Sequence, residues 1–421
     1  MDEIMAGVNA PDAVIVIGAG IIGLSVAMHL QSAGVKTVLL DAQTAGRGAT
    51  YGNAGHIATE QVFPIADTSI LRQLPRMLLD PMGPLRLEWR YLPRMTPWLL
   101  RLVANMRPAR VNHIHHALLA LNQKSLDAWQ QFARRWQLSQ WLQVQGSLLT
   151  AEKPQSVLAL QQHGARLNRL GITNEWLDAQ SLTEREPALA PSQLGALFYP
   201  HTGHVTNLDA VVRHLRTTFI QLGGVLRENC AVEHAQVHAD QTVMLHTACG
   251  PMSAKQVVLC AGAHSRKLTR ALTGVEVPLD TERGYHFMLP SETSRLSIPV
   301  TSVDRRFIMT PMDTGLRLAG TVEFAGLHAP ANMQRARQLL QLAQPMLNLP
   351  LDNTNASTWM GLRPSIADSL PVIDRQGPVL LAFGHQHLGL TQAALTAQLI
   401  EALYFNFDPG VDMHPYRLRR F

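Results

Sequence analysis

The chain is poor in residue types that mark special environments. Its 421 residues include only three cysteines, too few and too irregularly spaced for a disulfide framework or a metal site: Cys230, Cys249 and Cys260. We therefore expect buried, reduced thiols. Charged residues make up 16% of the chain, and the net charge of +5 comes from scattered Lys and Arg. This composition is typical of a globular protein and gives no indication of nucleic-acid binding.

Long hydrophobic runs are also absent, since no stretch approaches the roughly 18 apolar residues of a membrane span. Met1-Asp2-Glu3 lacks the basic and apolar regions of a signal peptide, so a cytoplasmic location is expected. Residues 81–110 depart from the rest, because they combine aromatic residues and arginines with one acid, Glu88. Such a segment favours either helical packing between domains or peripheral contact with the inner face of an anionic membrane. Packing is the preferred interpretation.

The most informative motif follows an apolar run at residues 13–17. Gly18, Gly20 and Gly23 have the G-x-G-x-x-G spacing, and a second apolar run ends on Asp41. In a βαβ unit these glycines permit a tight turn, a close approach to a pyrophosphate and close helix packing. The helix N-terminus offers N–H groups to the phosphates, and the acid can bind a ribose. The segment therefore predicts a dinucleotide site.

Periodicity predicts further elements along the chain, with Asn207 as the N-cap of one helix. We expect helices at 113–136, 207–222, 331–347 and 391–405, buried strands at 225–232, 254–259 and 379–384, and antiparallel strands within 277–324. Since the nucleotide-binding pieces recur along the chain, the domains must interleave. The predicted fold is α/β, with a Rossmann-type domain (residues 12–80, 201–276 and 351–421) interleaved with an α+β substrate domain on an antiparallel sheet (residues 81–200 and 277–350).

Five separated motifs carry a family resemblance. They are residues 18–41, 46–55, 260–263, 359–373 and 383–391. The chain resembles the FAD-dependent amino acid oxidases and dehydrogenases, a family that includes glycine oxidase, sarcosine oxidase and bacterial D-amino acid dehydrogenase. Asn53-Ala54-Gly55 and Leu362-Arg363-Pro364 make it most similar to the D-amino acid dehydrogenases.

The resemblance implies FAD as the cofactor and assigns residues to it. These are Gly18, Gly20, Ile22, Gly23, Asp41, Ala49, Thr50, Asn53, Gly55, Val232, Ala261, Gly262, Gly384, Leu388, Gly389 and Thr391. Sarcosine oxidases attach their flavin through a cysteine in the C-terminal region. No cysteine follows Cys260, so we expect non-covalent FAD. No metal is expected, because no acid or cysteine completes a ligand set with His113, His115 and His116.

Three residues are predicted to act on the substrate. Arg363 matches the arginine that binds the substrate carboxylate, and a guanidinium can form two parallel hydrogen bonds to it. Tyr285 resembles a tyrosine that reaches the same carboxylate, and His56 follows the loop beside the flavin. His385 and His387 could line the same face. Two departures from the family pattern are Gln386-His387, where small residues are common, and Gly52, where alanine is usual.

These features predict dehydrogenation of a D-amino acid, or of a cyclic amine such as D-hydroxyproline, by hydride transfer to flavin N5. A quinone or another respiratory carrier is the expected electron acceptor. Two alternatives stay open. One is an oxygen-using amine oxidase of the glycine or sarcosine type, and the other is an FAD subunit of a heteromeric dehydrogenase.

Overall fold

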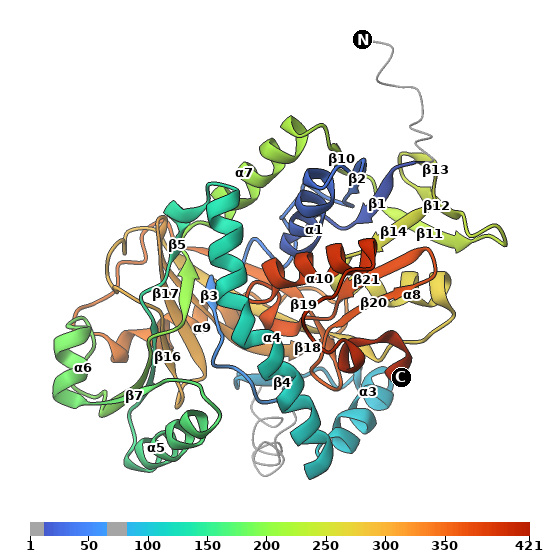
Figure 1. The fold of residues 1–421 in the computed structure, drawn as a ribbon. Helices are drawn as coiled ribbons and strands as arrows, with labels where there is room; N and C mark the ends of the chain where they lie inside the picture. The colour runs from blue at the N-terminus through green and yellow to red at the C-terminus, as the bar shows by residue number, and fades with distance from the viewer. Residues whose placement is uncertain (1–11, 65–81) are drawn as a thin grey trace.

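The computed structural model describes residues 12–64 and 82–421. Two large sheets organise these residues, and both are assembled from segments far apart in the sequence (Figure 1). Among the described helices, none combines the length and hydropathy that a membrane span requires.

The first sheet has six strands, and their order is β10-β2-β1-β14-β21-β20. In chain order these strands are β1 (Val14–Ile17), β2 (Thr37–Leu40), β10 (Val225–Arg227), β14 (Gln256–Leu259), β20 (Val372–Gln376) and β21 (Val379–Phe383). All neighbours pair in parallel except β20 and β21. Continuous apolar runs suit strands that are covered on both faces. The strand expected at 225–232 is interrupted, because β10 ends at Arg227 and a separate hairpin begins at Val232.

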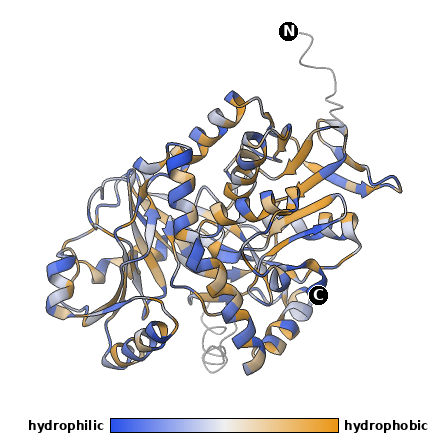
Figure 2. Ribbon diagram, viewed as in Figure 1, coloured by the Kyte–Doolittle hydropathy of each residue, from blue (hydrophilic) through white to orange (hydrophobic). Residues whose placement is uncertain are grey.

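Two layers cover this sheet. One contains helices α1 (Ile21–Ser32), α7 (Leu208–Gln221) and α10 (Ala393–Phe405), with the long α4 (Pro108–Arg135) packed on α10. The other contains β11 (Val232–Val237), β12 (Val243–Thr247), β13 (Gly250–Ala254) and α8 (Ser265–Thr273). Figure 2 shows the hydrophobic strands of the sheet between these layers. The Asn207 side chain accepts a hydrogen bond from Ala210 N at 3.0 Å, which confirms the predicted N-cap of α7.

The second sheet has nine strands and is mainly antiparallel. Its order is β19-β15-β18-β17-β16-β6-β8-β7, with β4 beside β18. The strands are β4 (Leu85–Leu87), β6 (Ser147–Ala151), β7 (Glu175–Asp178), β8 (Gly195–Tyr199), β15 (Leu279–Leu289), β16 (Val300–Ser302), β17 (Phe307–Met312), β18 (Gly315–Phe324) and β19 (Ser357–Ile366). Helices α3 (Leu92–Asn105), α5 (Pro154–Arg169), α6 (Ala179–Arg185) and α9 (Gln334–Ala343) lie around it.

Short elements join the two halves. A small sheet contains β3 (His56–Ile57), β9 (Gly203–Val205) and β5 (Leu142–Gln143). The single-turn 3-10 helices are Ser139–Trp141, Gly262–His264, Gln344–Met346, Gln386–Leu388, His414–Tyr416 and Leu418–Arg420. The expected fold class is confirmed: a Rossmann-type sheet is interleaved with an α+β domain on an antiparallel sheet. One expected boundary differs, because β19 lies within residues 351–421 but pairs with β15 of the second sheet.

The expectation of buried, reduced thiols is wrong for two of the three cysteines. The structure pairs Cys230 with Cys249 in a disulfide, and Cys249 is exposed. The cause is strand register: β11 and β12 place Val232 opposite Thr247, and each cysteine lies two residues beyond that pair. Cys260 is free and buried, as expected.

Candidate functional site

A cavity of about 1270 Å³ lies between the two large sheets. The carboxyl ends of β1, β2, β14 and β21 form one wall, and one face of β15, β18 and β19 forms another. Helix α3 closes part of the remaining side. The crevice outside the carboxyl ends of parallel strands is where α/β sheets bind their ligands.

At two of the glycines that follow β1, a side chain would collide with neighbouring backbone atoms. Gly18 has φ +103°, and a β-carbon there would lie 2.5 Å from Cys260 O. A β-carbon on Gly23 would overlap Gly18 O, so α1 packs directly against the turn. Gly20 precedes the first turn of α1 and lines the cavity. The sequence therefore forms a turn without side chains at a helix N-terminus, which is suited to a pyrophosphate.

Asp41 follows β2 and also lines the cavity. Its Oδ2 accepts a hydrogen bond from Ala19 N at 2.6 Å, and its Oδ1 accepts one from Gln43 N at 2.8 Å. Burial is the main cause that raises the pKa of Asp41, and these hydrogen bonds act in the opposite direction. The two bonds hold the carboxylate at the strand end, where the ribose of a dinucleotide is expected.

Most residues predicted to bind the cofactor line this one cavity. They are Gly18, Gly20, Ile22, Asp41, Ala49, Thr50, Asn53, Val232, Ala261, Gly262, Gly384 and Gly389. Four others do not line it and lie behind its wall: Gly23, Gly55, Leu388 and Thr391. Leu388 is buried in the core, and Thr391 Oγ1 accepts a hydrogen bond from Ala58 N at 2.9 Å. Gly55 has φ +79°, and a β-carbon there would lie 2.7 Å from Met312 Cε.

Helix α10 begins at Ala393, two residues later than Thr391, and a 3-10 turn at 386–388 precedes it. Within that turn Gln386 has φ +52°, a backbone conformation that glycine adopts more easily. Its Nε2 donates a hydrogen bond to Ile366 O at 3.0 Å. This bond holds the turn against β19. Gln386, which stands where small residues are common in the family, therefore has a local structural role.

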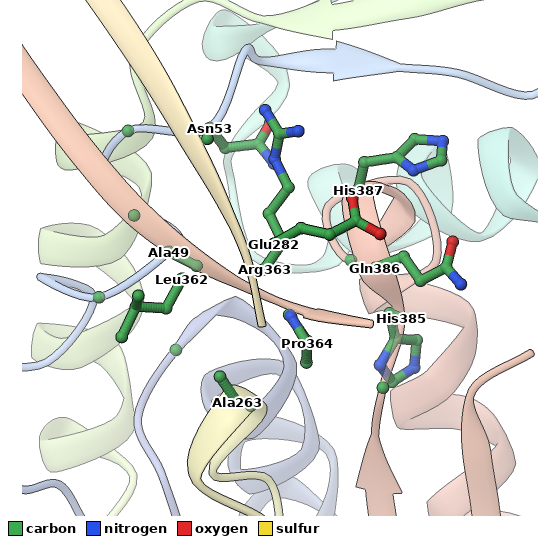
Figure 3. A pocket seen from close by; sticks show the side chains of 18 of the residues that line it. Ala49, Asn53, Ala263, Glu282, Leu362, Arg363, Pro364, His385, Gln386 and His387 are labelled. Atoms are coloured by element: carbon green, nitrogen blue, oxygen red, sulfur yellow. The ribbon is translucent and has the colours of Figure 1, made fainter. Parts of the chain in front are cut away.

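Arg363 lies on β19 and extends into the cavity (Figure 3). Its side chain makes no hydrogen bond or ion pair with any residue that the structure describes. Its guanidinium lies over Gly284, where a β-carbon would overlap it. Burial lowers the pKa of Arg363, and the nearby carboxylate of Glu282 acts in the opposite direction. A guanidinium that is always charged in proteins and has no partner is suited to an anionic ligand.

Glu282 is the direct cross-strand partner of Arg363 in the β15–β19 pair. Such pairs project to the same face of a sheet, and Figure 3 shows both side chains in the cavity wall. Ser365 Oγ donates to Glu282 Oε1 at 2.6 Å, whereas Oε2 has no partner in the described parts of the chain. Burial raises the pKa of Glu282. The site thus presents a cation and an acid side by side.

Tyr285 is placed differently from the prediction. Tyr285 lines the cavity, but it is three residues along β15 from Glu282, so the two side chains project from opposite faces of the strand. The hydroxyl donates to Glu323 Oε2 at 2.5 Å and accepts from Asn332 N at 3.2 Å. The structure therefore does not bring the Tyr285 hydroxyl together with the Arg363 guanidinium.

The three predicted histidines lie at the cavity in uncharged form. Burial lowers the pKa of His56 and His385 to about 3 and that of His387 to about 4, and Arg363 adds to the effect on His387. His385 Nε2 is also 3.0 Å from Thr396 Oγ1. None of them contributes a positive charge near neutral pH. His115, for which no metal site was expected, forms a hydrogen bond through Nδ1 with Val62 O.

The sequence reasoning missed two features of the site. Glu282 is absent from the predicted site, because its place beside Arg363 follows from the pairing of β15 with β19 and from no local pattern. Trp359 belongs to one of the five motifs, which gives it no separate role. Its ring stacks on that of His286, with 5.1 Å between the ring centroids, and lies against Gly52. Gly52 in place of the usual alanine was the available signal, since it makes room for this ring.

The glycine turn, the hydrogen-bonded Asp41 carboxylate and the cavity beyond them define a dinucleotide-binding protein. The family model described as "DAO: FAD dependent oxidoreductase" matches residues 13–403, so the chain belongs to this family of FAD-dependent oxidoreductases. The cofactor is therefore FAD. The tight turn at Gly18 and Gly23, where a β-carbon would collide with backbone atoms, fits its pyrophosphate.

Similar proteins cover nearly the whole chain. D-amino-acid oxidase from Bradyrhizobium diazoefficiens is 31% identical over 97% of this chain and 98% of its own length. D-amino acid dehydrogenase from Vibrio vulnificus is 25% identical over 96% of this chain and 99% of its own length. Glycine oxidase from Geobacillus kaustophilus shares the fold, with a TM-score of 0.75 and 20% identity over 97% and 98% of the two chains.

Proposed function

We propose that the protein oxidises a free D-amino acid to the imino acid and transfers the electrons to FAD. The observation that carries this proposal is the unpartnered Arg363 guanidinium in the wall of the cofactor cavity. An α-carboxylate is the anion that such a group would bind with two parallel hydrogen bonds. The relatives named D-amino-acid oxidase and D-amino acid dehydrogenase support the class and the stereochemistry.

Arg363 and Glu282 together match the two charged groups of an amino acid. In this proposal Arg363 binds the carboxylate, and the free Oε2 of Glu282 accepts a hydrogen bond from the amino group. Two fixed substituents leave the α-carbon with few orientations, which favours a reactive alignment. A carboxylate with a raised pKa can also take the proton that an ammonium must lose before oxidation.

The remaining predicted residues hold the cofactor in this proposal. The turn at Gly18, Gly20 and Gly23 and the N-terminus of α1 bind the pyrophosphate, and Asp41 binds the ribose. FAD, when bound, supplies the two-electron oxidation. We propose that it is held without a covalent bond, because no cysteine follows Cys260.

The proposed electron acceptor is a quinone or another respiratory carrier. Helix α3 belongs to the aromatic and arginine-rich segment noted in the sequence. It buries Met95 and Trp98 against the second sheet, so this part of the segment packs against other elements. Trp89, which precedes α3, and Leu100 and Val103 within it are more than half exposed, and Trp89 and Val103 also line the cavity. An apolar, arginine-rich surface beside the cavity is suited to a membrane-dissolved acceptor. The relative named as an oxidase favours oxygen as the alternative.

Anaerobic reduction of the purified flavoprotein tests the proposal. D-amino acids, L-amino acids, glycine, sarcosine and D-hydroxyproline are mixed with the enzyme, and bleaching of the flavin absorbance is followed. Rapid bleaching by D-amino acids supports the proposal, and bleaching by glycine or sarcosine alone favours the amine oxidase. Reoxidation by a quinone analogue without hydrogen peroxide identifies the dehydrogenase. No bleaching without a partner subunit would favour a heteromeric enzyme.

A further inference from the structure

A second, smaller cavity of about 220 Å³ opens beside the main one, and we call it the side chamber. Four residues line both spaces: His56, Gln61, Thr301 and His387. His387 also interacts electrostatically with Arg363, and Figure 3 shows its ring across from the Arg363 side chain. The two spaces therefore adjoin at these four residues.

Three buried polar atoms at the side chamber have no hydrogen-bond partner. They are Glu60 Oε2, His56 Nε2 and Tyr199 OH. Each side chain is about nine-tenths buried or more, and Glu60 Oε2 lies 3.9 Å from His56 Nε2. A buried polar group without a partner costs roughly 1–3 kcal/mol. Three such atoms in one cavity indicate a site that a polar ligand completes.

The chemistry of these atoms selects the ligand. All three can accept a hydrogen bond, since His56 is uncharged, and Glu60 is the one carboxylate among the described residues that line the chamber. A primary ammonium has three donors and no acceptor. Its charge would compensate the carboxylate, and its donors match the three acceptors in number.

We propose that the side chamber binds the terminal ammonium of the substrate side chain, so that the enzyme prefers D-amino acids of the lysine and ornithine type. Arg363 holds the α-carboxylate, and Glu60, assisted by Tyr199 and His56, holds the ammonium at the other end. This inference rests on the proposed oxidation of amino acids and adds the substrate class.

Steady-state kinetics with matched substrates test it. D-lysine and D-norleucine differ only in the terminal ammonium, and so do D-ornithine and D-norvaline. The expected kcat/KM for D-lysine exceeds that for D-norleucine by roughly 10- to 100-fold, the range for a hydrogen bond to a charged group. In Glu60→Gln the ratio falls to near 1 while D-norleucine is oxidised as before. Equal use of both substrates by the unmodified enzyme would overturn the proposal.

Two further variants separate recognition from folding. Tyr199→Phe removes one acceptor and lowers the D-lysine preference without loss of D-norleucine oxidation. Ser147→Ala is the matched control, because Ser147 also lines the chamber but its Oγ already accepts a hydrogen bond from Thr202 at 2.8 Å. Its preference should stay unchanged. A preference for D-lysine that survives both Glu60→Gln and Tyr199→Phe contradicts the assignment.

The pH dependence adds an independent signature. Burial raises the pKa of Glu60 to about 7, so its carboxylate form, which binds a cation, increases as pH rises through 7. The titratable groups around Glu60 are His56, His163, Tyr199, His204 and His387. Burial lowers the pKa of each histidine and raises that of Tyr199, so all five stay uncharged above pH 7. The exposed Arg166 lies over the ring of Phe63. The D-lysine preference should therefore rise between about pH 6 and 8, and a flat profile contradicts a role for Glu60.

Unreactive ligands distinguish a failure of this inference from a failure of the proposed function. ε-Aminocaproate has the carboxylate and the terminal ammonium of lysine but no α-amine, and caproate lacks the ammonium. Thermal stabilisation of the FAD-loaded enzyme should be larger with ε-aminocaproate, and Glu60→Gln should remove the difference. If no amino acid reduces the flavin but this difference is present, only the proposed oxidation fails. If D-amino acids reduce the flavin but the difference is absent, only the side-chamber assignment fails.

Discussion

Gly52 lies against the indole ring of Trp359, so closely that a β-carbon at position 52 would overlap the six-membered ring. His286 stacks on the same ring, and His286 Nδ1 is 3.1 Å from Gly52 O. The loop beside the cofactor is thereby attached to β15 and β19. The Trp359 ring can take this position only because residue 52 has no side chain.

Gly52→Ala is expected to lower the free energy of unfolding by about 1–3 kcal/mol, the usual cost of overpacking. The added methyl group has no space unless the Trp359 ring moves. Urea denaturation followed by intrinsic fluorescence measures the loss. In the double variant with Trp359→Leu the penalty of the alanine should largely disappear, and an unchanged penalty would show that the ring is not the obstacle.

Gly284→Ala is expected to displace the Arg363 guanidinium, because the new β-carbon overlaps it. If Arg363 binds the substrate carboxylate, kcat/KM for D-amino acids falls by roughly 30-fold, which corresponds to about 2 kcal/mol. Anaerobic flavin reduction over a range of substrate concentrations measures the effect. Combined with Arg363→Gln, the alanine should add no further loss. Additive losses would mean that the two positions act separately.

Glu282→Gln is expected to weaken the binding of amino acids about tenfold but not the binding of simple carboxylates such as propionate. The amide oxygen still accepts a hydrogen bond but carries no negative charge to attract the ammonium, whereas Arg363 still binds the carboxylate. Spectral titration of the flavin with both kinds of ligand gives the two affinities. Equal weakening of both would instead indicate that Glu282 acts by positioning Arg363.

The pH profile gives a second readout for Glu282. Burial raises the pKa of its carboxyl group, so the carboxylate form is lost as pH falls through that raised value. In the unmodified enzyme, kcat/KM should rise with pH across this ionisation. The corresponding inflection should be missing in Glu282→Gln, and its persistence would assign the ionisation to another group.

Tyr285→Phe separates a structural role from a substrate contact. The change removes the hydroxyl that donates to the buried Glu323, so we expect a loss of about 1–3 kcal/mol in the free energy of unfolding. The KM for D-amino acids should change less than twofold, because the ring lies on the face opposite Arg363. Urea denaturation and steady-state kinetics provide the two values. A large rise in KM with unchanged stability would restore the direct contact predicted from the sequence.

The fold of the cofactor domain could be predicted because its signals are local. An apolar strand, glycines at fixed offsets and an acid after the next strand specify a βαβ unit within residues 13–41. The expected N-cap at Asn207 and most of the predicted buried strands are found for the same reason. The placement of β19 in the second sheet was not predictable, since its pairing with β15 joins segments far apart in the chain.

The family, the cofactor and the position of Arg363 follow from motifs at fixed spacing, and such motifs can be found in the linear chain. Tertiary structure decided which side chains share the site. Strand register places Glu282 beside Arg363 and turns Tyr285 away, and a slip of one residue would reverse both. Register also brings Cys230 to Cys249. These outcomes depend on contacts between distant strands, which no local pattern encodes.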